Sequence, residues 1–248
     1  MLVSMWVAFS RYALPASTNA SNSGRMESFI YCTSPLECSA YRKLLENVKD
    51  GLVFSRDGDN VVDAGHGGAD PGMVGIGDLE EKGINLAIAQ ELKELLEKDG
   101  YQVVMTREED KGLYQEGSSN KKAQDMQNRC ALIAEEKPAV SVSIHQNSYS
   151  DPEVKGPQVF YYEHSAQGEE LAVCIQEQLN QQLEVERPRQ VKGNSTYYLL
   201  KRSEGVLNIV ECGFLTNPQE AELLQTKEYQ KRIAGAIKDG IVEYLQKL

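Results

Sequence analysis

From Asn60 to the C-terminus, short apolar runs alternate with stretches of helical periodicity, and this alternation constrains the fold more than any other feature. Each run has the length of a buried strand, and the stretches between most of them repeat apolar residues every three or four positions. The predicted strands span residues 60–64, 101–106, 139–144, 157–162, 196–200 and 206–212. Strands that alternate with helices form a largely parallel sheet, so we expect an α/β fold with a mostly parallel six-stranded sheet and helices on both faces.

Apolar stripes and capping signals mark the predicted helices. The stripes are Ile84, Ile88, Leu92, Leu95 and Leu96; Ala123, Met126, Cys130 and Ile133; Leu171, Ile175, Leu179 and Leu183; and Tyr229, Ile233, Ile237 and Leu245. Gly100 follows the first stripe at a natural C-cap position, and Pro138 ends the second. Before the last stripe, Asn217 suits the N-cap, Pro218 the first helical position and Glu220 the acid of a capping box.

The strand at 157–162 is the exception to the parallel arrangement. Only residues 146–156 (QNSYSDPEVKG) separate it from the preceding strand, and they show no helical pattern. A parallel connection generally needs a crossover of a dozen or more residues. We therefore expect one antiparallel strand here, which places His164 on the opposite edge of the sheet from His145.

Residues 1–58 lack this regularity, and we expect an irregular N-terminal segment before a domain of residues 59–248. Residues 2–9 (LVSMWVAF) are apolar but short, and no Lys or Arg precedes them, so they make only a weak export signal. They are compatible with a signal or anchor remnant, or with an artefact of start-site choice. Residues 15–24 are typical of a linker or a disordered segment, and residues 38–49 of one short helix.

The composition excludes one class of partner. The formal net charge is −11, whereas phosphate binding needs clustered Lys and Arg, so we expect no nucleic-acid partner. The hydrophobic fraction of 41% and the charged fraction of 25% are those of a globular domain.

Two of the three histidines follow predicted parallel strands. His66 comes just after the strand 60–64, and His145 ends the strand 139–144, so both project from the carboxyl edge, where α/β sheets form their sites. Glu81 begins the helix that follows His66. The helix dipole also favours an acid there, although it does not choose between Glu80 and Glu81. Two histidines and one carboxylate are a catalytic zinc set, whereas each residue alone is more often structural.

Glu211 is the remaining chemical candidate. It lies near the carboxyl end of the apolar strand 206–212, and a carboxylate is rarely buried without a partner or a task. One interpretation is a structural ion pair. The other is a general base beside a metal ion, which takes a proton from water and later delivers it to a leaving amine.

These segments resemble the zinc-dependent N-acetylmuramoyl-L-alanine amidases. The similar segments are residues 62–68 (VDAGHGG), Glu81-Lys82 with Asn85-Leu86, Thr106-Arg107, residues 143–147 (SIHQN) and residues 210–217 (VECGFLTN). The resemblance runs in order and spacing from about residue 59 to the C-terminus. Residues 156–162 and the lack of a wall-binding repeat are most similar to the branch that acts on spore cortex.

The resemblance implies an enzyme that hydrolyses the amide bond between N-acetylmuramic acid and L-alanine in peptidoglycan. It implies one Zn²⁺ held by His66, Glu81 and His145, with Glu211 as the catalytic base. It also implies an extracytoplasmic location, in the cell envelope or the forespore intermembrane space. We expect a monomer or a weak oligomer, and the sequence does not identify an activating partner protein.

Two other functions remain compatible with these residues. One is a different zinc peptidase of the cell wall, such as a carboxypeptidase that acts on stem peptides. The other is a non-catalytic wall-binding protein that keeps the fold. Arg107 and Arg129 are candidates either for binding substrate carboxylates or for a structural salt bridge.

Overall fold

The structure of the chain is a computed structural model, and it describes residues 60–248. The predictions for residues 1–58, namely an irregular segment with a linker and one short helix, lie outside the described residues. Within the described part, no helix is both long and apolar enough to cross a membrane. The described part begins at Asn60 with a strand over residues 60–64, as the sequence predicts.

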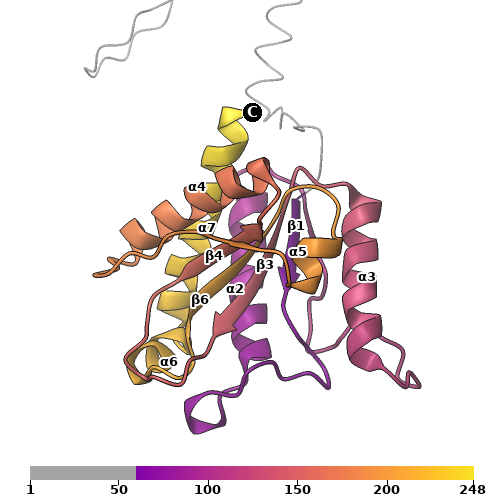
Figure 1. The fold of residues 1–248 in the computed structure, drawn as a ribbon, viewed down its shortest axis with the longest axis horizontal. Helices are drawn as coiled ribbons and strands as arrows, with labels where there is room; N and C mark the ends of the chain where they lie inside the picture. The colour runs from indigo at the N-terminus through magenta and orange to yellow at the C-terminus, as the bar shows by residue number, and fades with distance from the viewer. Residues whose placement is uncertain (1–59) are drawn as a thin grey trace, which may run out of the picture. The chain divides into compact units, whose positions relative to one another are not determined.

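Six strands form one sheet in the order β2–β1–β3–β6–β4–β5. They are β1 (Asn60–Ala64), β2 (Val103–Met105), β3 (Val140–Asn147), β4 (Gln158–Tyr162), β5 (Lys192–Asn194) and β6 (Leu207–Phe214). Parallel pairing joins β1 to β2, β1 to β3, β3 to β6 and β4 to β5, whereas β4 pairs with β6 in the antiparallel sense. The mostly parallel α/β sheet and its antiparallel pairing at residues 157–162 are therefore confirmed (Figure 1).

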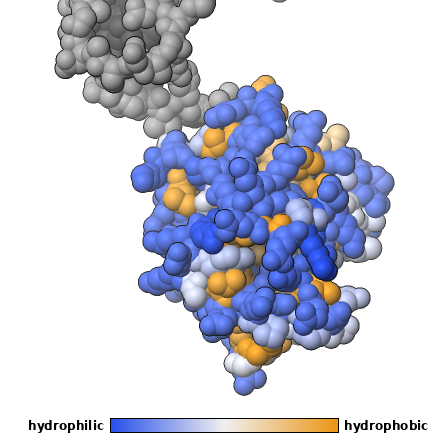
Figure 2. Space-filling view, turned by 90° about the vertical axis from the view of Figure 1, so that its left-hand side faces the viewer, coloured by the Kyte–Doolittle hydropathy of each residue, from blue (hydrophilic) through white to orange (hydrophobic). Residues whose placement is uncertain are grey.

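Helices cover both faces of this sheet. They are α2 (Glu81–Lys98), α3 (Lys121–Glu136), α4 (Ala166–Gln182), α5 (Tyr198–Arg202), α6 (Pro218–Leu224) and α7 (Lys227–Lys247), with the short 3-10 helix η1 (Ile76–Asp78) between β1 and α2. α2, α4 and α7 pack on one face, and α3 and α5 lie on the other (Figure 1). The face seen in Figure 2 is mostly hydrophilic, as expected where apolar stripes point inward.

The pleat of the strands decides which side chains reach which face. Val62 belongs to the larger hydrophobic cluster with α2, α4 and α7, whereas Val61 and Ile209 belong to the smaller cluster with α3 and α5. Successive side chains alternate between the faces of a strand. Asp63 therefore shares the α3 and α5 face with Val61, and Glu211 shares it with Ile209. Both acids are directed to the same side of the sheet.

The prediction of a strand at residues 196–200 is wrong. Residues Tyr198–Arg202 form α5, in which Leu199 and Leu200 are both buried. A short apolar run is compatible with a strand or a helix, because it shows no period. The strand that completes the six-stranded sheet is instead β5, whose sequence Lys-Gly-Asn carries no strand signal. It is defined by its pairing with β4 at the edge of the sheet.

The C-terminal helical region consists of two helices rather than one. Asn217 caps α6 as predicted, since its side-chain oxygen accepts hydrogen bonds from two backbone N–H groups of the first turn. Thr226 caps the separate helix α7. Glu220 does not act as a capping-box acid, because its carboxylate accepts hydrogen bonds from the backbone N–H groups of Gly156 and Phe214. It ties α6 to the end of β6 and the segment before β4.

Candidate metal centre

The three predicted metal ligands meet at one edge of the sheet. β1 and β3 are parallel neighbours in register, so His66 and His145 leave the same edge, and Glu81 is the first residue of α2. Nε2 of His66 lies 3.2 Å from Oε2 of Glu81, and Nδ1 of His145 lies 2.9 Å from Oε1. One donor atom from each residue lies within 4.8 Å of the others. This arrangement is compact enough for one metal ion.

Two glycines allow this close approach. A Cβ atom on Gly65 would lie 2.3 Å from Cε1 of His145, and one on Gly72 would lie 2.5 Å from Oε2 of Glu81. Gly72 also has a φ of +71°, which a residue with a side chain rarely adopts. His66 itself has a φ of +62°, so its backbone conformation has to be held by its surroundings.

Arg129 supplies part of that support. Its guanidinium group is buried, with Nη1 paired to Asp63 and Nε 2.7 Å from Oδ2 of Asp125. Nη1 also donates a hydrogen bond of 2.9 Å to the carbonyl oxygen of Ala64, and Nη2 donates one of 2.7 Å to that of His66. The Asp63–Arg129 ion pair is thereby connected to the backbone of His66, a predicted metal ligand.

Arg107 holds the same segment from its other side. Its Nε donates to the carbonyl oxygen of Ala64 at 2.9 Å, and its Nη2 donates to those of Gly65 at 3.0 Å and Lys82 at 2.8 Å. Arg107 and Arg129, the two arginines that the sequence singles out, therefore both donate hydrogen bonds to backbone carbonyl groups around the site. These contacts favour the structural interpretation of the pair over direct binding of substrate.

The buried carboxyl group of Asp63 stays ionised. Burial alone raises its pKa, but the charge of Arg129 and hydrogen bonds from Ser143 and Thr106 outweigh burial and lower the pKa to about 2. The Thr106 hydroxyl donates to Oδ1 at 2.7 Å, and the Ser143 hydroxyl donates to Oδ2. The Asp63–Arg129 pair therefore remains charged at neutral pH.

We predict that Arg129→Met lowers the free energy of unfolding by about 3–5 kcal/mol, because it leaves the Asp63 carboxylate buried without its partner. Urea unfolding followed by circular dichroism measures the change. Arg232→Met is the control, since Arg232 is half exposed and its ion pair with Glu184 is 3.8 Å long. Its loss should cost about 1 kcal/mol or less. Equal effects of the two substitutions would contradict the structural role of Arg129.

The Glu81 carboxylate is held by groups from three segments. Oε1 accepts hydrogen bonds of 3.0 Å from Nδ2 of Asn85 and from the backbone N–H of Gln146. Oε2 accepts one of 2.8 Å from the backbone N–H of Met73. Burial raises the pKa of Glu81, but the imidazoles of His145 and His66 outweigh burial and hold it well below its usual range. The group is an ionised, oriented carboxylate.

Glu211 lies beside this cluster on the next strand. It is the register partner of His145 in the pairing of β3 with β6. Its Oε2 atom is buried and has no hydrogen-bond partner among the described residues. Burial raises the pKa of Glu211 to about 7, and the Glu81 charge adds to this while both imidazoles oppose it. A carboxyl group with one unpaired oxygen and a pKa near neutrality has the properties of a general acid–base group.

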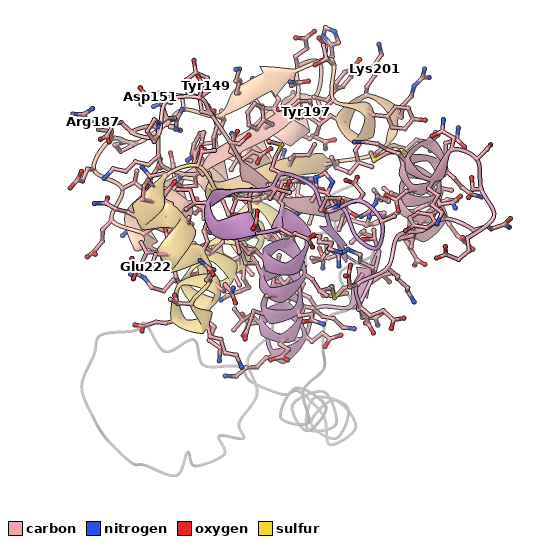
Figure 3. The ribbon with its side chains drawn as sticks, turned by 90° about the horizontal axis from the view of Figure 1, so that it is seen from below. Tyr149, Asp151, Arg187, Tyr197, Lys201 and Glu222 are labelled. Atoms are coloured by element: carbon pink, nitrogen blue, oxygen red, sulfur yellow. The ribbon has the colours of Figure 1, made fainter. Side chains whose placement is uncertain are left out.

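Two cavities of about 220 Å³ and about 300 Å³ meet at the cluster. Six residues line both of them: His66, Asp70, Lys122, His145, Tyr197 and Glu211. Figure 3 views the molecule from below and labels Tyr197, one of these six residues. A substrate that enters either cavity therefore reaches the two predicted histidine ligands and Glu211.

The structure separates His164 from the cluster, as the antiparallel strand predicts. Its side chain is 68% exposed and lies 3.5 Å from the carboxylate of Glu163 at the end of β4. Among the described residues, the group that could hold a metal ion consists of His66, Glu81 and His145.

Three residues at the cavities were not identified from the sequence. Oδ2 of Asp70 lies 3.0 Å from Nδ1 of His66, and Lys122 and Tyr197 line both cavities. Asp70 lies four residues after His66 in an irregular loop, so no periodic pattern indicates the contact. Tyr197 lies in the run of residues 196–200, which predicts a strand, whereas the structure places this residue at the N-cap of α5. Lys122 has the sequence context of any surface lysine at a helix start.

The fold and the site together define a class: an α/β protein whose sheet carries a two-histidine, one-glutamate cluster of the type that holds catalytic zinc. The chain belongs to the N-acetylmuramoyl-L-alanine amidase family, whose sequence pattern matches residues 61–243. This assignment confirms the resemblance seen in the sequence motifs.

Individual relatives agree with the family assignment. The germination-specific N-acetylmuramoyl-L-alanine amidase of Bacillus subtilis (strain 168) is 38% identical over 186 residues, which are 74% of this chain and 78% of that protein. The CwlD amidase from Clostridioides difficile, solved in complex with the GerS lipoprotein, is 38% identical with a TM-score of 0.75, covering 77% of this chain and 100% of that chain. AmiC2 of Nostoc punctiforme is 32% identical with a TM-score of 0.67, covering 75% and 96%.

Proposed function

We propose that the protein is a zinc-dependent amidase that hydrolyses the bond between N-acetylmuramic acid and L-alanine in peptidoglycan. One observation carries the proposal: His66, Glu81 and His145 converge within 4.8 Å, and beside them lies Glu211, whose buried Oε2 atom has no hydrogen-bond partner among the described residues. A structural ion pair, the other interpretation of Glu211, has no support, since no cationic side chain is paired with it among the described residues.

The residues fit a zinc ion by their chemistry. Two imidazoles and one carboxylate form a known catalytic ligand set with an open fourth position. Nδ1 of His66 faces the Asp70 carboxylate while Nε2 faces Glu81, and such a carboxylate contact is typical of a metal-binding histidine. When bound, zinc supplies Lewis acidity that activates water and polarises the scissile carbonyl group.

Glu211 performs the proton transfers in the proposed reaction. It accepts a proton as water adds to the lactyl carbonyl carbon, and it donates that proton to the alanine nitrogen as the C–N bond breaks. The products are a lactyl carboxylate on the glycan and a peptide with a free amino group. A carboxyl group with a pKa near 7 is suited to both transfers, because neither protonation state is strongly favoured.

The relatives support a more specific biological role. The Bacillus subtilis relative is germination-specific, and the CwlD amidase was solved with the GerS lipoprotein. We propose that residues 59–248 are the catalytic domain of an extracytoplasmic enzyme that acts on spore cortex. A partner protein of the lipoprotein class is a further proposal, tested by measuring zinc content and activity with and without such a partner.

Digestion of purified peptidoglycan by the zinc-loaded protein tests the proposed activity. The expected products, identified by mass spectrometry, are intact stem peptides and glycan strands with free lactyl groups. Loss of a terminal amino acid from peptides that stay attached would instead identify a carboxypeptidase. Binding to peptidoglycan without any cleavage would identify a wall-binding protein.

We predict that Asp70→Asn weakens zinc binding by about 10- to 100-fold, because the His66 imidazole loses the charge of the carboxylate that orients it. Competition with a chelator of known zinc affinity measures the change. Asp239→Asn, on α7 and remote from the cluster, should leave zinc affinity unchanged. An unchanged affinity in Asp70→Asn would show that this contact does not support a metal ligand.

A further inference from the structure

The two cavities have an unbalanced distribution of charge. The acids Asp70 and Glu211 line both, Glu81 lines the larger one, and Asp63 and Asp125 line the smaller one. Apart from the histidines, the cationic side chains that line them in the described part of the chain are Arg129 and Lys122. Arg129 is buried and engaged by two aspartates. Among the described residues, Lys122 is therefore the accessible cationic side chain that lines both cavities.

The ammonium group of Lys122 has free donors. Its Nζ lies 3.9 Å from Oδ2 of Asp70, which is too long for a hydrogen bond, and its side chain is 75% exposed. The Asp70 carboxylate already faces His66 and accepts a hydrogen bond from the backbone N–H of Gly72. No contact with another described residue therefore fixes the amine, and its flexible stem can follow a ligand.

Lys121 provides a contrast within the same helix. Its Nζ lies 2.7 Å from Oε2 of Glu116 and stands 4.9 Å from the centre of the Tyr114 ring. It lines neither of the two cavities. Both lysines belong to the first turn of α3, where the helix dipole favours anions. Of these two lysines, only Lys122 also lines the cavities.

We propose that Lys122 is a specificity-determining residue that binds a carboxylate of the stem peptide and so places the peptide part of the substrate towards α3. The inference rests on the proposed function. In a muramoyl peptide the free carboxylates belong to the peptide, whereas the sugar carries hydroxyl and acetamido groups. An accessible cation on one side of the cluster therefore distinguishes the two parts of the substrate and sets the direction in which it binds.

Two matched muramoyl dipeptides test this proposal with the full chain. In one the peptide carboxyl groups are free, and in the other all of them are carboxamides. Their Kd values are measured by NMR titration in a Glu211→Gln background, which prevents turnover. We expect a preference of about three- to fivefold for the carboxylate ligand, the scale of an exposed ion pair, and a smaller preference at high salt.

Variants assign the preference to one residue. Lys122→Met should remove it by weakening only the carboxylate ligand, Lys122→Glu should reverse it, and Lys121→Met should leave it unchanged. Retention of the preference in Lys122→Met, equal weakening of both ligands, or no measurable binding of the carboxylate ligand would overturn the proposal. Failure of the zinc-loaded wild-type protein to cleave peptidoglycan would instead contradict the proposed function, since the ratio of Kd values requires no turnover.

Discussion

Glu211→Gln is expected to lower kcat by about 10²- to 10⁴-fold, because the amide keeps the shape of the side chain but cannot accept the proton of water. The zinc content should remain at one ion per chain, since Glu211 lies outside the cluster of three predicted ligands. Turnover of a muropeptide and zinc content by atomic emission, measured on the same samples, test both parts of this prediction.

A matched substitution separates this effect from a general loss of negative charge. Glu222→Gln changes an exposed glutamate of α6, which Figure 3 labels away from Tyr197, and it should leave kcat unchanged. Near-normal turnover in Glu211→Gln would exclude Glu211 as the base. Loss of zinc from Glu211→Gln would indicate a role in metal binding rather than in proton transfer.

His66→Ala and His145→Ala are expected to lose bound zinc and, with it, activity. Each substitution removes one of the three proposed protein ligands, so the affinity should fall by more than the roughly 10- to 100-fold expected for loss of a supporting contact such as that of Asp70. Equilibrium dialysis against buffered zinc measures the affinity of each variant.

The third histidine is the matched control for these substitutions. His164 is exposed at the end of β4, outside the cluster, so His164→Ala should bind zinc as the wild-type protein does. A zinc-free His164→Ala protein would overturn the ligand assignment. Full retention of zinc by either His66→Ala or His145→Ala would exclude that residue from the site.

Much of the fold was predictable because its signals are local. Strands such as β1 and β3 are short apolar runs, and α2 carries an apolar stripe that ends near Gly100, which has a φ of +88°. β5 and α5 were not predictable in this way. The Lys-Gly-Asn sequence of β5 becomes a strand only by pairing with β4, and the apolar run in α5 has no period that distinguishes helix from strand.

The chemical residues of the site were predictable for a topological reason. Parallel neighbouring strands bring their carboxyl ends to one edge, so His66 and His145 meet although they are far apart in the chain. The supporting residues depend on tertiary packing instead. Asp70 approaches His66 from an irregular loop, and Lys122 reaches the cavities because of where α3 packs on the sheet. Neither contact has a periodic signal in the sequence.

The two arginines show how packing resolves an alternative that the sequence leaves open. From the sequence alone, Arg107 and Arg129 are compatible either with binding substrate carboxylates or with a structural salt bridge. Their burial and their hydrogen bonds to the carbonyl groups of Ala64, Gly65 and His66 show that they support the backbone around the first predicted ligand. The accessible cation of the site is Lys122 instead.

The most direct measurement is a crystal structure of the zinc-loaded protein with anomalous data collected at the zinc absorption edge. We expect one anomalous peak at the carboxyl edge of β1 and β3, at about 2.0–2.2 Å from a donor atom of each of His66, Glu81 and His145. A peak bound elsewhere, for example at His164, or no peak between these three residues in protein that retains zinc, would contradict the account.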